Sequence, residues 1–389
     1  MKLLLVVLDG AGDRGKHTPL EMSKTPTFDM LAKTGQVGLL DIGYKTHVNS
    51  DFGYLNLLGC YSKETYPGRG YLEALGIGAR PNEEDVCIRG NFATLDQKGM
   101  LKDRRAGRDE TGLKSFCDKL DGTEIDGIHF SVKKSAGHRV VLILKGRNLS
   151  DKIIPNDPEE TGVSLPQVKP REPKAKFTAS VLNKFVSRAH KTLSKEPINK
   201  KRKLPANIIL IRNPGRKNTV PSFKTRYGLK GTCVAGIPIA KGVSRYLGLD
   251  VTEVPGATGM PDTNLKGKIN ATMKALKKYD FVFLHINGTD ILSHDAKRKE
   301  KTEFIEKIDM EIGRLSLKDI VTIVTCDHRT ESEPGFKAYR HLKDPVPVLV
   351  AGNSIKPSRV NLFSEKECEK GFRIEGNSLI TFVLKETKK

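Results

Sequence analysis

The chain has 389 residues, more than one ordinary hydrophobic core accommodates, and therefore predicts two domains. Its 37% hydrophobic and 29% charged residues are typical of a soluble globular protein, and the lack of any run approaching a membrane span excludes a transmembrane protein. The net charge is +21, but the basic residues are not interleaved with aromatic residues of the kind that stack on bases. We therefore expect a solvated basic surface rather than a nucleic-acid partner.

Five short apolar runs predict the strands of one sheet. In chain order they are residues 3–8, 208–211, 281–286, 320–324 and 346–350. Each run is continuous rather than alternating, a pattern that suits parallel strands buried on both faces. Apolar residues at helical spacing over 269–276 and 304–315 lie between the later runs. This alternation predicts an α/β fold with a doubly wound, mainly parallel sheet.

The middle of the chain has a different pattern, which predicts an inserted α+β domain. Residues 140–144 belong to a stretch that alternates, and the polar segment 150–173 contains five prolines. Prolines at this density favour an irregular connection, and a helix is expected over 178–193. We therefore predict a discontinuous catalytic domain of residues 1–80 and 207–389, interrupted by an inserted domain of residues 81–206.

Acidic and imidazole side chains follow three of the predicted strands. Asp9 ends the first run, Asp290 and His294 follow the third, and Asp327 and His328 follow the fourth. Ligands in open α/β sheets gather outside the carboxyl ends of strands, so these residues are expected to converge. One such Asp is more often a helix cap, and one such His is more often structural. Together they favour a site for divalent ions of the zinc or manganese kind.

Two further residues have competing interpretations. Ser50 precedes a short helical pattern at 54–58, where backbone N–H groups favour an anion, but an ordinary N-cap serine has the same position. His285 lies inside the third apolar run, and we interpret it as a structural residue. The residues alone therefore do not identify a nucleophile.

The cysteines are scattered and include no CxxC pair. They are Cys60, Cys87, Cys117, Cys233, Cys326 and Cys368. This spacing predicts reduced thiols and excludes a zinc knuckle. Because the first apolar run is also too short for the core of a signal peptide, we expect a cytoplasmic protein.

A series of short motifs resembles the archaeal-type 2,3-bisphosphoglycerate-independent phosphoglycerate mutases of the alkaline-phosphatase superfamily. The motifs are LDG at 8–10, TPTFD at 25–29, NSD at 49–51, GRG at 68–70, RGNFAT at 89–94, DRRAGR at 103–108, GATG at 256–259, GTD at 288–290 and DPVP at 344–347. They occur in the family's order and cover nearly the whole chain. The resemblance implies an alkaline-phosphatase-like fold in which Ser50 is the nucleophile.

The family's activity would make this chain an isomerase of glycolysis and gluconeogenesis. The resemblance implies that 3-phosphoglycerate and 2-phosphoglycerate are interconverted through a phosphoserine, without bisphosphoglycerate. It also implies two divalent ions, of manganese, zinc, magnesium or cobalt. The implied ligands of one ion are Asp9, Ser50, Asp327 and His328, and those of the other are Asp290, His294 and His341.

In this family the insert supplies arginines that bind the substrate and closes over it. The implied residues are Arg104, Arg105 and Arg108, with weaker matches at Arg212, Arg216 and Lys241. An ordinary surface ion pair is the alternative for each of them.

The sequence departs from the family's usual pattern near the site. Asn49 replaces the usual glycine before Ser50, and Arg329 replaces a small residue after His328. Neither removes a ligand, but both leave the acceptor undecided. A homoserine kinase-like enzyme or a phosphatase would use the same site, and a basic nucleic-acid-binding protein is a third alternative. The expected partner is a small phosphorylated molecule, and a homo-oligomer is compatible with the sequence.

Overall fold

The computed structural model describes residues 1–45, 48–333, 341–358 and 360–388. The chain divides into two compact units: unit 1 comprises Met1–Lys63 and Val220–Lys389, and unit 2 comprises Glu64–Thr219. Unit 2 therefore interrupts unit 1, and its borders differ from the predicted 81 and 206.

Both borders differ because two elements of unit 2 lie outside the predicted insert. Helix α4 (Arg69–Gly76) packs against strand β3 (Val86–Leu95). Strand β10 (Ile208–Gly215) pairs antiparallel with β3, for example Ile209 with Phe92. The run at 208–211 is thus a strand of the second sheet, and its predicted place in the main sheet was wrong.

The main sheet of unit 1 is mostly parallel. Its order is β12 (Asp250–Val251), β11 (Gly231–Val234), β13 (Phe281–Ile286), β1 (Lys2–Leu8), β14 (Ile320–Thr325), β17 (Val346–Ala351), β2 (Gln36–Asp41) and β18 (Phe372–Glu375). At the centre, Val7 lies opposite both His285 and Thr325. The segments that follow these three strands therefore leave the sheet at one edge.

One strand of this sheet runs against the prediction. Strand β17 is antiparallel to both β14 and β2, whereas the run at 346–350 was expected to be parallel. After β14 the chain forms a pair of short antiparallel strands, β15 (Arg329–Thr330) and β16 (His341–Leu342), and then enters β17. A parallel neighbour requires a longer crossover, and a run buried on both faces does not reveal its direction.

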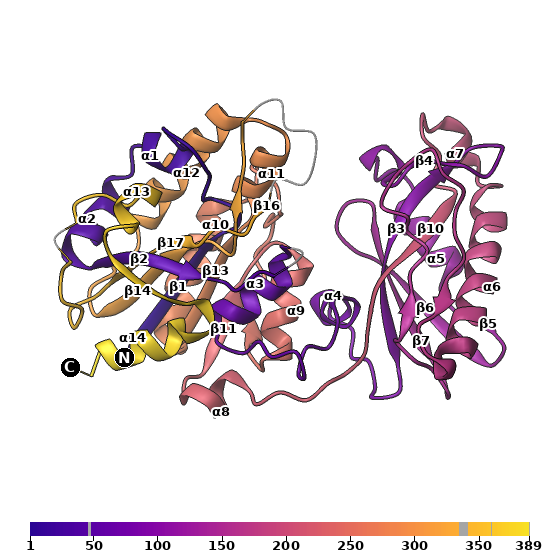
Figure 1. Ribbon diagram of the computed structural model, residues 1–389, viewed down its shortest axis with the longest axis horizontal. Coiled ribbons are helices and arrows are strands. Elements are labelled where there is room, and N and C mark those ends of the chain that lie inside the picture. The colour runs from indigo at the N-terminus through magenta and orange to yellow at the C-terminus, as the bar shows by residue number, and fades with distance from the viewer. Residues whose placement is uncertain (46–47, 334–340, 359, 389) are drawn as a thin grey trace. The chain divides into compact units, whose positions relative to one another are not determined.

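Helices cover both faces of the main sheet (Figure 1). One layer contains α1 (Pro19–Met22), α2 (Pro26–Thr34), α10 (Leu265–Lys278), α12 (Arg298–Ile312) and α13 (Glu365–Cys368), and the other contains α3 (Ser50–Leu57), α9 (Pro238–Tyr246) and α14 (Leu379–Glu386). The predicted helices at 269–276 and 304–315 are α10 and α12. Within the described ranges, no helix combines the length and apolarity that crossing a bilayer requires.

Unit 2 is built on an antiparallel sheet with its own core. The strand order is β10, β3, β7 (Arg139–Lys145), β6 (Ile128–Lys134) and β5 (Thr123–Ile125). Helices α5 (Leu113–Leu120) and α6 (Lys176–Leu193) cover one face, where Phe130 stacks on Phe185 with ring centroids 4.3 Å apart. Helix α4 covers the other face. The expected α+β composition and the helix at 178–193 are both present.

Candidate active site

The first group of ligand-type side chains lies at the carboxyl edge of the main sheet. Asp9 follows β1, and Asp327 and His328 follow β14; all three are fully buried. His328 Nε2 lies 3.3 Å from Asp327 Oδ2 and 3.6 Å from Asp9 Oδ1. We call this group cluster 1. One ligand atom of each residue lies within 4.8 Å of those of the other two.

A second group, cluster 2, comes from helix α11 (Gly288–His294) and strand β16. Asp290 and His294 lie one helical turn apart on α11, with 3.4 Å between Oδ2 and Nε2. His341 Nε2 lies 3.3 Å from Asp290 Oδ1 and 3.0 Å from His294 Nε2. His341 Nδ1 is 3.0 Å from the carbonyl oxygen of Val48 and donates to it, so in the neutral ring the lone pair is on Nε2.

Ser50 is the first residue of α3 and reaches cluster 1. Its Oγ lies 3.4 Å from His328 Nε2. Tyr54 lies one turn after Ser50 on the same helix. Its hydroxyl donates to Oδ2 of Asp9, the residue that follows β1. His285 Nε2 lies 2.7 Å from the Tyr54 hydroxyl and 3.1 Å from Asp9 Oδ2. Asp9 Oδ2 is thus occupied by protein groups, and Asp9 Oδ1 remains on the side of His328.

The electrostatics of cluster 1 fit a divalent cation. Asp9 Oδ1 and Asp327 Oδ2 are buried and accept no hydrogen bond from the part of the chain described here. Burial raises the pKa of Asp327 well above its ordinary value, and the carboxylates of Asp9 and Asp290 raise it further. Burial and the nearby His341 lower the pKa of His328 to about 3, so its imidazole is neutral. Crowded carboxylates beside a neutral imidazole are a ligand set for zinc, manganese or a similar ion.

The charge of cluster 2 differs from that of cluster 1, because cluster 2 has two histidines and one carboxylate. Burial tends to raise the pKa of Asp290, but His294 and His341 together hold it well below its ordinary value. Burial tends to lower the pKa of His341, but the nearby Asp290 carboxylate and the bond to Val48 raise it overall. The Asp290 carboxylate is therefore charged, with imidazole nitrogens on both sides.

Unit 2 gathers arginines on the sheet face that α4 covers. The strand register places Arg89 of β3 opposite Arg212 of β10, and Arg139 of β7 opposite Asn91 of β3. Arg69 of α4 joins them. We call this surface the arginine face.

The Glu73 carboxylate lies inside the arginine face. Glu73 Oε1 is 3.3 Å from Arg89 Nε and 3.4 Å from Arg69 Nε. Burial, together with Arg69 and Arg139, lowers the pKa of Arg89 well below its ordinary value. The guanidinium groups of this face thus lie close enough to disfavour one another's charge, and an anion would relieve that repulsion.

The substrate arginines expected from the sequence have different environments. Arg105 and Arg108 are exposed and lie near His138, whose pKa is lowered to about 2 by burial and then by Arg139, Arg105 and other arginines. Arg104 and Arg212 both pair with Asp157, at 2.8 Å and 2.9 Å.

The other two expected residues are bound to groups of their own unit. Arg216 donates to the carbonyl oxygens of Leu149, at 3.4 Å, and Glu83, at 2.9 Å. Lys241, in unit 1, pairs with Glu253 at 2.5 Å.

Several site residues were not found by sequence reasoning. They are Tyr54, His285 and Thr330 in unit 1, and Arg69, Arg89 and Arg139 in unit 2. Two of them carried a signal, because His285 and Arg89 are polar side chains inside buried strands. A buried polar side chain needs a hydrogen-bond or ion-pair partner. For both residues this partner comes from another element, which the sequence does not identify.

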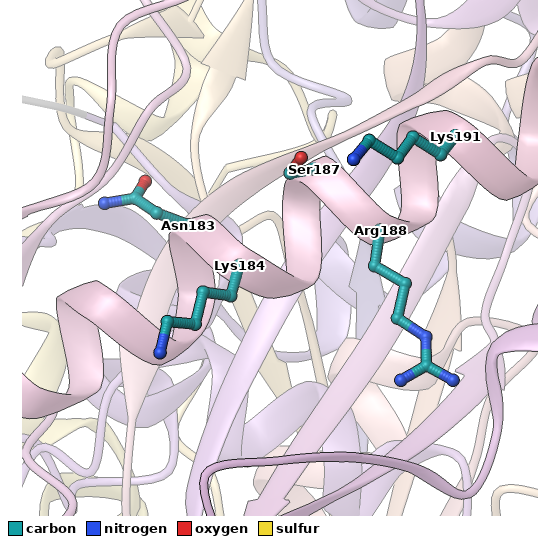
Figure 2. A pocket seen from close by; sticks show the side chains of 5 residues that line it. All are labelled: Asn183, Lys184, Ser187, Arg188 and Lys191. Carbon is teal, nitrogen blue, oxygen red and sulfur yellow. The ribbon is translucent and has the colours of Figure 1, made fainter.

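A basic hollow on α6 is a second candidate for anion binding (Figure 2). It is lined by Asn183, Lys184, Ser187, Arg188 and Lys191. All five come from one helix, and Lys184 is paired with Asp126 at 2.7 Å. The hollow brings together no imidazole, carboxylate and hydroxyl groups of the kind found at Ser50, and we interpret it as solvated surface.

Comparison with known proteins gives consistent matches along the chain. A family model described as 2,3-bisphosphoglycerate-independent phosphoglycerate mutase matches residues 32–199. A Methanocaldococcus jannaschii protein named 2,3-bisphosphoglycerate-independent phosphoglycerate mutase 1 is 40% identical, over 95% of this chain and 93% of that protein. A Thermococcus kodakarensis protein named 2,3-bisphosphoglycerate-independent phosphoglycerate mutase is 39% identical, over 98% and 96%.

Two solved structures share the fold over the whole chain. The PH0037 protein from Pyrococcus horikoshii superposes with a TM-score of 0.83 at 33% identity, covering 100% of this chain and 97% of that one. The cofactor-independent phosphoglycerate mutase from Thermoplasma acidophilum superposes with a TM-score of 0.69 at 31% identity, covering 100% of both chains.

Proposed function

This chain belongs to the family of 2,3-bisphosphoglycerate-independent phosphoglycerate mutases, and we propose that it interconverts 3-phosphoglycerate and 2-phosphoglycerate through a phosphoserine at Ser50. The observation that carries the proposal is the position of Ser50, whose Oγ lies 3.4 Å from a buried imidazole of cluster 1. A serine needs such an activating environment to act as a nucleophile. A relative at 40% identity supplies the reaction class.

We assign one divalent ion to each cluster. Cluster 1 with Ser50 would hold one ion, and cluster 2 would hold the other, with manganese, zinc, magnesium or cobalt as candidates. When bound, the ions would favour the alkoxide of Ser50 and neutralise charge on the phosphoryl oxygens.

Ser50 then carries the phosphoryl group between the two hydroxyls of glycerate. Its oxygen forms a bond to phosphorus while the bond from phosphorus to the 3-oxygen of the substrate breaks. The bound glycerate turns, and its 2-oxygen takes the phosphoryl group from Ser50, which regenerates the serine. Because the phosphoryl group comes from the substrate itself, no bisphosphoglycerate primer is required.

The arginine face supports binding of the substrate's anionic groups. Arg89 and Arg139 are held by the sheet, and all four arginines, with the exposed Arg105 and Arg108, lie near enough to His138 to lower its pKa. Guanidinium groups bind carboxylate and phosphate with paired hydrogen bonds. Arg104 and Arg212, oriented by Asp157, remain part of the proposed binding set. The contacts of Arg216 and Lys241 support structural roles instead.

A homoserine kinase-like activity or a phosphatase activity would use the same nucleophile. The unusual Arg329 gives these alternatives no support, because its guanidinium donates to the carbonyl oxygens of Pro345, at 2.6 Å, and Asp13, at 3.2 Å. Its side chain is thus committed to the protein interior.

An enolase-coupled assay with 3-phosphoglycerate and manganese, without primer, tests the proposed function. We expect turnover with 3-phosphoglycerate and none with ATP plus homoserine. Release of inorganic phosphate as the main product, or turnover only with homoserine, would reject the mutase assignment.

The cellular setting follows from the chemistry of the chain. We propose a cytoplasmic enzyme with a small phosphorylated substrate and no nucleic-acid or membrane partner. The six cysteines are buried free thiols, as a reducing compartment allows.

A further inference from the structure

Thr330 lies between the two clusters and contacts both. It is a fully buried residue of β15, paired with His341 of β16. Its Oγ1 is 2.9 Å from Asp290 Oδ1, in cluster 2. The same Oγ1 is 3.0 Å from His328 Nδ1, in cluster 1. One hydroxyl group therefore connects a ligand-type residue of each cluster.

The directions of the two hydrogen bonds follow from proton counting. The Thr330 hydroxyl has one hydrogen, and a carboxylate oxygen can only accept, so this hydrogen is donated to Asp290. The hydroxyl must then accept from His328, which places the imidazole proton on Nδ1. The lone pair of His328 is left on Nε2, the nitrogen that faces Ser50 and Asp327. The histidine is thus fixed in the tautomer that binds a metal ion through Nε2.

The surrounding backbone holds this hydroxyl in place. The Thr330 N–H donates to Gly12 O at 2.8 Å, and the Thr330 carbonyl accepts from the buried Lys301 Nζ at 3.0 Å. Gly10, with φ +61°, leaves the necessary space, because a Cβ there would lie 2.5 Å from Thr330 Oγ1 and 2.7 Å from Asp290 Oδ1. A side chain on Gly10 would therefore break the connection.

We infer that Thr330 is a positioning residue that connects cluster 1 with cluster 2. It does so by fixing the tautomer of His328 and the orientation of Asp290. The inference rests on the proposed function, since it presumes that both clusters bind ions. Partners of this kind orient the ligands, and their loss typically weakens metal binding by about 10- to 100-fold. Because one hydroxyl serves both clusters, its loss should weaken both sites.

The test measures manganese binding to the metal-stripped full-length protein by isothermal titration calorimetry. Thr330→Val removes the hydroxyl and keeps the shape, whereas Thr330→Ser keeps the hydroxyl. Thr322→Val is the matched control, because Thr322 is a fully buried threonine of β14 whose hydroxyl contacts no hydrogen-bond partner among the described residues. Circular dichroism of the metal-free proteins checks that each variant folds.

We expect two manganese ions per wild-type chain. In Thr330→Val the affinity of both sites should fall by about 10- to 100-fold. Thr330→Ser and Thr322→Val should bind as the wild type does. Two ions bound to Thr330→Val with wild-type affinity would overturn the role of Thr330 and leave the proposed function standing. A wild type that binds no ion would overturn the proposed function as well.

A second measurement needs no folded variant of Thr330. Long-range ¹H–¹⁵N spectra of ¹⁵N-histidine-labelled wild type report which ring nitrogen carries the proton, and His328→Gln assigns the signal. The inference predicts a proton on Nδ1 of His328. A proton on Nε2 alone would overturn it.

Discussion

The two clusters of unit 1 and the arginine face of unit 2 concentrate charge of opposite sign. The two clusters of unit 1 contain three carboxylates and three imidazoles. Two of the carboxylate oxygens lack a hydrogen-bond partner among the described residues. Unit 2 gathers the guanidinium groups of Arg69 and Arg89 around Glu73, and Arg212 of the same face pairs with Asp157. Each arrangement brings like charges together, and a ligand of opposite charge would relieve the repulsion, cations in the first and an anion in the second.

The difference between the regions lies in what each contributes to a reaction. Unit 1 has a hydroxyl beside its charged groups, Ser50, which under the proposed function is the nucleophile that makes and breaks bonds. The arginine face has none of this kind among its described residues and can only bind and orient. Variants should separate these two roles.

The largest effect is expected for Ser50→Ala. Mutase activity should fall by many orders of magnitude, because Ser50 alone accepts the phosphoryl group, while manganese binding stays largely intact. Activity is measured by the enolase-coupled assay and metal by calorimetry. Retention of more than about a tenth of the activity would exclude the covalent route.

Removal of the metal ions should have a nearly equal effect. Chelation should abolish activity, and added manganese should restore it, because carboxylate and imidazole ligands exchange readily. Bisphosphoglycerate should not substitute for the ion. An enzyme that stays fully active after exhaustive chelation, verified by metal analysis, would contradict the assignment of both clusters.

A smaller loss is expected for Arg105 and Arg108, the two exposed arginines near His138. Arg105→Ala and Arg108→Ala each remove a charge-assisted hydrogen bond worth about 1.5–3 kcal/mol, so kcat/KM should fall roughly ten- to hundredfold. Arg188→Ala, an exposed arginine of α6, is the matched control and should leave kcat/KM unchanged. Equal kcat/KM values for all three variants would show that neither Arg105 nor Arg108 binds the substrate.

The smallest effect concerns stability at low pH. His138 has a folded-state pKa of about 2, far below its unfolded value, so unfolding takes up a proton once the pH falls below about 6.5. Above about pH 6.5 His138 has no effect on the pH dependence of folding stability. Below that pH it lowers the free energy of unfolding by up to about 1.4 kcal/mol per pH unit. Urea unfolding at pH 7.5 and pH 5.5 should show a smaller loss for His138→Gln than for the wild type. Equal losses would contradict a neutral, buried His138.

The main site could be predicted because its geometry follows from strand order. Asp9, Asp290 and Asp327 follow strands that are parallel neighbours, so their convergence required only that the strands share a sheet. Ser50 was different, because nothing local distinguishes it from an N-cap serine. The family resemblance supplied its expected role, and the structure brings its Oγ toward His328.

The arginine face could not be predicted in the same way. Its members come from a helix and from antiparallel strands, where the neighbours of Arg89 depend on the pairing register. Register is set by turns and packing that the sequence pattern does not reveal. The direction of the run at 346–350 was missed for a related reason, because both of its faces are buried.

The most direct test of the central claim is a single-turnover reaction quenched in acid within milliseconds. Enzyme in excess is mixed with 3-phosphoglycerate and manganese, and the digested protein is analysed by mass spectrometry. The account predicts a transient phosphate on the peptide that contains Ser50, formed and consumed at rates compatible with turnover. Conversion of 3-phosphoglycerate to 2-phosphoglycerate with Ser50 unmodified at every time point would contradict it.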